Sequence, residues 1–231
     1  VDGGRDFYSA SGRAGQILLD QGDSARLHAH FDKLRQEHPD RAERLYNLEA
    51  DLLSRADHVN AAMGVLSRGL QDVPESASLR YARAMLAERQ DDLELMELDL
   101  RQIIARDPDN ATALNALGYT LANRTERYDE AYQLIARALE LEPEEPAILD
   151  SMGWVLYRRG QYSEAIPYLT RAYARFPDPE VAAHLGEVLW ASGDTEGAMQ
   201  VWQGALEKAP GHEVLVSTLR RLGVSGLAAG Q

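Results

Sequence analysis

Residues that carry out chemistry in other proteins occur in this chain without the spacing that a reactive site needs. The chain has no cysteine, which excludes disulfides, thiolate zinc sites and thiol catalysis. It has no GxSxG, no HExxH, no P-loop and no GxGxxG after a strand. The histidines are scattered, and even the closest two would point to different sides of a helix; they are His28, His30, His38, His58, His184 and His212. We therefore predict no enzymatic activity, no metal site and no cofactor.

Carboxylates are abundant, but their patterns are typical of structure rather than of catalysis. The stretch DPDNATALN, which begins at Asp107, has the acids of a calcium loop but lacks its central glycine and its terminal glutamate. It is better explained as the start of a helix capped by a polar side chain. The acidic runs at 91–99 and 140–145 fit solvated helix faces or loops.

The composition excludes several classes of partner. Twenty-four basic against 37 acidic residues give a net charge of −13, which argues against binding to nucleic acid and to anionic lipid. No apolar run approaches the roughly 18 residues that a membrane span needs, and no secretory signal is visible. The chain does not begin with methionine. We expect it to be a piece of a longer or processed protein, whose missing part would hold any targeting segment.

Prolines and small residues recur at intervals of 33 to 35 residues along most of the chain. Periods of this length are typical of helical repeat proteins. The prolines are Pro39, Pro74, Pro108, Pro143, Pro177 and Pro210, and the small residues are Gly15, Ala50, Ala84, Gly118, Gly153 and Gly186.

Each repeat has the pattern of two helices joined by a turn. In the repeat from 146 to 177, apolar and small residues recur at helical spacing on both sides of Gly160. We expect Gly160 to end the first helix, Ser163 to cap the second and Pro177 to close the repeat. The small residues would lie where two helices approach closely, so leucine in place of Ala165 should overpack that contact by roughly 1–3 kcal/mol.

This pattern resembles the tetratricopeptide repeat, and Leu149, Met152, Gly153, Leu156, Ala165, Leu169, Ala172 and Pro177 show it well. The resemblance implies an all-α fold: a right-handed superhelical solenoid of helix-turn-helix repeats over residues 1–231. The predicted repeats are about 8–39, 43–74, 77–108, 111–143, 146–177 and 179–210. A capping helix at 212–222 and a disordered tail at 224–231 would follow.

In this family the first helices of the repeats line a concave groove that binds proteins or extended peptides. The resemblance places eleven residues there: Asn47, Asp51, Tyr81, Met85, Asn115, Tyr119, Asp150, Trp154, Tyr157, Glu187 and Trp190. Exposed aromatic rings beside amides and acids suit an extended peptide. In the alternative, Trp154 and Trp190 pack sideways against the next repeat. The acids would make the groove favour basic or neutral peptides over acidic ones.

The run LNALGYTLA…ILDSMGWVLYRRG is also similar to the C-terminal half of bacterial tetratricopeptide-repeat lipoproteins. That resemblance implies a periplasmic adaptor, anchored by an N-terminal lipid to the outer membrane. It would bind a carboxyl-terminal processing protease and help to deliver cell-wall hydrolases for proteolysis. The alternative is a substrate-recruiting or regulatory segment of a larger enzyme or an envelope assembly complex. Pairing of two copies through exposed end repeats is left open.

Overall fold

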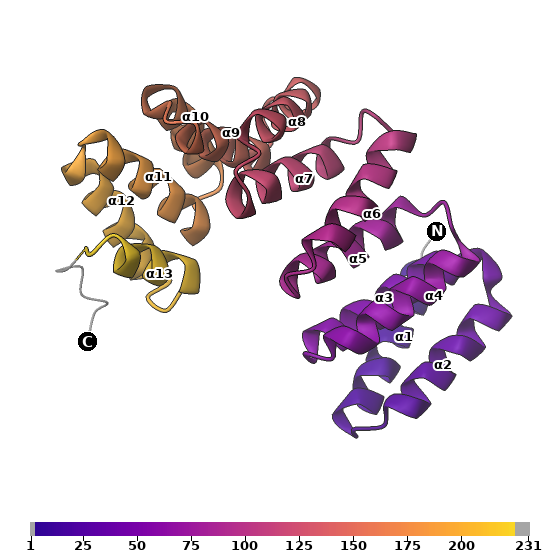
Figure 1. Ribbon diagram of the computed structural model, residues 1–231. Coiled ribbons are helices and arrows are strands. Elements are labelled where there is room, and N and C mark those ends of the chain that lie inside the picture. The colour runs from indigo at the N-terminus through magenta and orange to yellow at the C-terminus, as the bar shows by residue number, and fades with distance from the viewer. Residues whose placement is uncertain (1–2, 225–231) are drawn as a thin grey trace. The chain divides into compact units, whose positions relative to one another are not determined.

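The computed structural model describes residues 3–224, and this range contains thirteen α-helices, one short 3-10 helix and no strand (Figure 1). The predicted all-α architecture is therefore confirmed. The elements are α1 (Gly3–Asp20), α2 (Ser24–Glu37), η1 (Pro39–Arg41), α3 (Ala42–Arg55), α4 (Val59–Asp72), α5 (Ala77–Arg89), α6 (Leu93–Arg106), α7 (Ala111–Arg124), α8 (Tyr128–Leu141), α9 (Pro146–Arg158), α10 (Tyr162–Arg175), α11 (Pro179–Ser192), α12 (Thr195–Lys208) and α13 (Glu213–Arg221). None of these helices has both the length and the apolar composition to cross a bilayer.

Contacts between the helices divide the chain into two compact units, Val1–Arg106 and Asp107–Gln231. Unit 1 contains α1 to α6 and unit 2 contains α7 to α13. In each unit the odd-numbered helix packs against the even-numbered helix that follows it, and α13 packs on α11. That both units continue one solenoid over residues 1–231 stays a prediction. Of the predicted disordered tail, all but Val224 lies outside the described residues.

The regular interval of small residues corresponds to close contacts inside the helix pairs of unit 2. A Cβ atom added to Gly153 would overlap the side chain of Leu169, and one added to Gly186 would overlap the ring of Trp202. Both large side chains are fully buried. The small residues do lie at tight contacts between the paired helices, but a large side chain of the second helix, and not its backbone, faces Gly153 and Gly186.

The helix ends follow the sequence signals in part. The side chain of Asn110 accepts a hydrogen bond from the backbone N–H of Ala113 at 3.0 Å, which confirms the helix cap predicted for DPDN. Gly160 closes the turn after α9 with a φ of +77°, a conformation that glycine adopts readily. The predicted cap at Ser163 is wrong, because α10 begins at Tyr162, preceded by Gln161. Ser163 therefore lies within the first turn of the helix.

We predict that Gly186→Ala destabilises unit 2 by roughly 1–3 kcal/mol, because the added methyl group overpacks against the buried ring of Trp202. The measurement is urea unfolding followed by tryptophan fluorescence, since all three tryptophans lie in unit 2. Gly204→Ala on the adjacent helix is the matched control, because nothing lies within 4 Å of a Cβ atom there. The control should stabilise by about 0.5–1 kcal/mol through helix propensity. Equal effects of the two substitutions would contradict the packing argument.

Candidate functional site

The residues predicted to line a groove all lie on the first helix of a pair. Four belong to unit 1, on α3 and α5, and seven belong to unit 2, on α7, α9 and α11. The two sets are described separately, because each unit is a compact body of its own.

In unit 1 the four predicted residues are engaged one by one. The amide of Asn47 donates to the hydroxyl of Ser78 at 2.9 Å, which joins α3 to α5. The carboxylate of Asp51 is exposed and accepts from Arg55 on its own helix at 3.0 Å. Tyr81 and Met85 are half-buried, and burial raises the pKa of Tyr81. These contacts leave unit 1 without a joined cluster of the predicted residues.

In unit 2 the predicted residues meet around a histidine that the sequence analysis did not select. His184 on α11 donates from Nδ1 to both carboxylate oxygens of Asp150 on α9, at 3.0 and 2.9 Å. Its ring stacks on Trp154, with 4.2 Å between ring centroids and 25° between planes. His184 and Trp154 are only 5% and 6% exposed. We call Asp150, Trp154 and His184 the His184 cluster; it joins the first helices of two successive pairs.

Further hydrogen bonds extend this cluster across unit 2. The hydroxyl of Tyr119 on α7 donates to Glu180 on α11 at 3.0 Å. The hydroxyl of Tyr157 on α9 donates to Glu187 on α11, also at 3.0 Å. Arg221 on α13 then donates to both oxygens of Glu187, at 2.9 and 2.6 Å. These hydrogen bonds link α7, α9 and α13 to α11 through side chains.

These contacts change the electrostatics that the sequence suggested. Asp150 and Glu187 each have a basic partner, so neither is an open negative charge. Burial alone would lower the pKa of His184, but the charge of Asp150, its hydrogen bond and the nearby Glu180 and Glu187 together raise that pKa. Burial, with the charge and hydrogen bond of Glu187, raises the pKa of Tyr157 to about 12. Between residues 3 and 224, no three histidine or acidic side chains are grouped to hold a metal ion.

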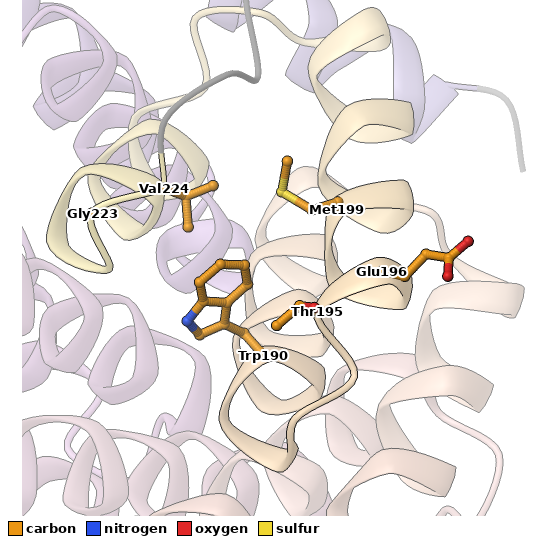
Figure 2. Close-up of a pocket in the computed structure, with 6 residues that line it drawn as sticks. All are labelled: Trp190, Thr195, Glu196, Met199, Gly223 and Val224. Carbon is orange, nitrogen blue, oxygen red and sulfur yellow. The ribbon is translucent and has the colours of Figure 1, made fainter.

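Trp154 and Trp190 differ in what their rings face. Trp154 is packed against the next helix pair, which is the alternative considered for it, and its buried indole N–H has no hydrogen-bond acceptor in the described chain. Trp190 is half-buried and lines an open cavity of about 500 Å³. Figure 2 shows its indole ring between Val224 and helix α12. We call this cavity the Trp190 pocket; its lining residues are Trp190, Thr195, Glu196, Met199, Gly223 and Val224.

The sequence analysis did not select His184 or Arg221, although the spacing of each from its acidic partner could have indicated it. Asp150 and His184 are 34 residues apart, and so are Glu187 and Arg221. An acid and a base separated by about one repeat occupy similar places in successive helix pairs, so they can meet when the pairs stack. Motifs confined to one repeat do not reveal such acid–base pairs.

Comparisons with known proteins agree with this architecture. Two family models, both described as tetratricopeptide repeat, match residues 109–178 and 151–213. The TPR repeat-containing protein PA4667 of Pseudomonas aeruginosa is 52% identical over 187 residues, which are 81% of this chain and 32% of that protein. This chain therefore spans about a third of the length of that relative.

Two further comparisons concern more distant proteins. The type IV pilus assembly protein PilF of Pseudomonas aeruginosa is 25% identical over 164 residues, which are 64% of this chain and 65% of that protein. The crystal structure of TTC0263, a thermophilic TPR protein of Thermus thermophilus, matches with a TM-score of 0.68 and 20% identity. The match covers 79% of this chain and all of that one. At this identity the likeness shows the fold alone.

We predict that Trp154→Ala destabilises unit 2 by about 3–5 kcal/mol, because it removes a buried ring that stacks on His184. Urea unfolding followed by the fluorescence of the two remaining tryptophans measures the loss. Trp190→Ala is the matched control and should cost clearly less, since its ring is only half-buried. An unchanged unfolding midpoint for Trp154→Ala would show that the stack contributes little to stability.

We predict that the contact between α9 and α11 weakens as the pH rises above about 6.5, the ordinary pKa of histidine. The pKa of His184 is higher in the folded than in the unfolded chain. Protonation therefore stabilises the fold, and this stability is fully present below the unfolded pKa and is lost as the pH rises through the folded pKa. Amide hydrogen exchange of α9 and α11, corrected for its intrinsic pH dependence, measures the effect.

The control for this prediction is a pair of variants. His184→Gln should remove the additional opening of α9 and α11 at higher pH, whereas His58→Gln, at an exposed histidine of unit 1, should leave it unchanged. The same pH profile in His184→Gln and in the parent chain would contradict the assignment.

Proposed function

We propose that the chain is a tetratricopeptide-repeat protein and that it serves as a non-catalytic scaffold that binds segments of other proteins; the matched repeat models and the shared fold support this. The observation that carries this proposal is the series of helix pairs in unit 2, which ends in an open, aromatic-lined cavity. Rigid helix pairs can present such a surface to a guest polypeptide without moving much themselves.

Within this class, we propose that the chain is part of an envelope adaptor lipoprotein. The adaptor would bind a carboxyl-terminal processing protease and bring cell-wall hydrolases to it. The support is the resemblance over residues 113–166, which lies within the first matched repeat region. The full-length protein would then be anchored by a lipid to the periplasmic face of the outer membrane.

A second candidate is a role in an envelope assembly complex. It is favoured by the similarity to the type IV pilus assembly protein PilF, which extends over 64% of this chain. The identity of 25% is much lower than the 52% shared with PA4667, so we rank this role second.

We predict that the 231-residue chain binds a purified carboxyl-terminal processing protease saturably and accelerates its degradation of a cell-wall hydrolase. The acceleration would arise because the scaffold holds enzyme and substrate together and raises their effective concentration. Binding is measured by biolayer interferometry, and degradation by the loss of intact hydrolase with time. The chain without the protease should leave the hydrolase intact, as a non-catalytic scaffold must.

The control is an unrelated acidic helical protein of similar net charge, which should neither bind nor accelerate. If the chain binds neither the protease nor the hydrolase, and the degradation rate stays the same, the protease-adaptor role is wrong. Saturable binding to a pilus-assembly component in the same assay, without binding to the protease, would instead favour the second candidate.

A further inference from the structure

We propose that the Trp190 pocket binds one aliphatic side chain of a partner polypeptide and that the partner carries a lysine or arginine beside that anchor. This inference rests on the proposed scaffold function and deepens it, because it names the site and the chemistry of the guest. Three features support it: most other predicted residues of unit 2 already have partners, the lining of the cavity is mainly apolar, and its one charged residue, Glu196, is acidic.

Most of the other predicted residues of unit 2 are already engaged within the unit. Tyr119, Asp150, Tyr157 and Glu187 are bound to partners within the unit, and Trp154 is buried in a stack. Those side chains would have to give up existing contacts to bind a peptide. Trp190 lines a cavity that the described residues leave open, so a guest there need not break a contact that the structure shows.

The lining of the pocket suits an apolar anchor. Trp190, Met199 and Val224 surround the space (Figure 2), and all three pack against the core of α11, α12 and α13. Behind Trp190 lies the fully buried ring of Trp202, with 5.8 Å between ring centroids. The floor is therefore held in place, while the unbranched side chain of Met199 can adapt to different aliphatic groups. A cavity of about 500 Å³ is in the range of natural binding pockets.

A missing side chain keeps one wall of the pocket open. Gly223 has a φ of +67°, and nothing lies within 4 Å of the place where a Cβ atom would be. Gly223 lies just beyond the end of α13 and lines the pocket without contributing a side chain.

The charges at the pocket select the flanking residue of the guest. Glu196 lines the pocket and is exposed, and its carboxylate points away from the indole ring (Figure 2). Its contact within the chain is a long one of 3.5 Å from the amide of Gln200. None of the six lining residues is basic. A lysine or arginine next to the anchor can therefore pair with Glu196, whereas an acidic neighbour would be repelled.

The test uses the three indole N–H signals of the full 231-residue chain in NMR spectra. The probe is the blocked peptide Gly-Lys-Leu-Lys-Gly. We expect it to shift the Trp190 signal saturably and to leave the signal of the fully buried Trp202 nearly unchanged. Replacing the leucine of the peptide by alanine should weaken binding about tenfold or more, since most of the anchor is lost. Replacing both lysines by glutamates should weaken it by at least about fivefold at low salt.

Two substitutions in the protein test the assignment to this pocket. Glu196→Lys should weaken binding of the lysine peptide by about fivefold. Its matched control is Glu207→Lys, at an exposed glutamate farther along α12, which should weaken binding much less. Met199→Gln keeps the length of the side chain but makes the wall polar, and it should weaken binding of all leucine-containing probes. Unchanged affinity in both Glu196→Lys and Met199→Gln would overturn the proposal.

Other occupants would give different results that also overturn it. If truncation after Val224 shifts the Trp190 signal without any peptide, the chain's own C-terminal residues occupy the pocket. If the signal depends on protein concentration, the occupant is a second copy.

If the probes leave Trp190 unaffected while the protease still binds saturably, the pocket is not a docking site but the scaffold function stands. If the probes bind here and the protease does not bind at all, the pocket assignment stands and the protease partner is wrong.

Discussion

A glycine of one helix lies against a large buried side chain of the next in the pairs of unit 2, and the rest of that unit depends on this close approach. The contact fixes how deeply the second helix settles on the first. It thereby decides which faces of the first helix remain for neighbouring pairs. Since protein interiors are close-packed, even one added methyl group must displace a neighbour. The 33- to 35-residue period in the sequence is the trace of this requirement.

Neighbouring helices also meet through polar groups, and these contacts carry a different energetic meaning. Both units bury carboxylates beside basic partners: Glu49 accepts from Arg35 at 2.6 Å in unit 1, and Asp150 accepts from His184 in unit 2. Removing one partner leaves an uncompensated buried charge, which costs more than the pair itself contributes. Such pairs therefore stabilise little in total, but they disfavour any stacking in which the two groups do not meet.

The sequence was sufficient for the parts of the structure that depend on local or periodic information. The helix pairs follow from the period, the glycine contacts follow from residue size, and the cap at Asn110 follows from its side chain. The cap expected at Ser163 failed because α10 begins two residues earlier than a cap there would require. Helix ends are set by tertiary contacts as well as by the capping residue, so signals of this kind place them only within a residue or two.

The candidate site was harder to predict, because it depends on which side chain the next repeat brings. Position along a helix showed that Trp154 and Trp190 lie on the same kind of face, but not what covers them. Trp154 is covered by His184 from the next pair, whereas Trp190 lines an open cavity beside Gly223 and Val224. The sequence placed both rings on first helices but could not show which of them a neighbouring pair covers.

The last described helix, α13, is shorter than the helices of the pairs, and this explains why the open cavity lies beside the last described pair. Helix α11 has 14 residues, but the helix that packs on it, α13, has only nine. A shorter neighbour covers less of the apolar face, so the part of α11 near its C-terminal end keeps exposed aromatic surface. In a middle repeat, the same surface would be buried by the next pair and would contribute to stability. Beside the shorter α13 this surface can bind a guest, because binding there does not compete with a contact made by the described residues.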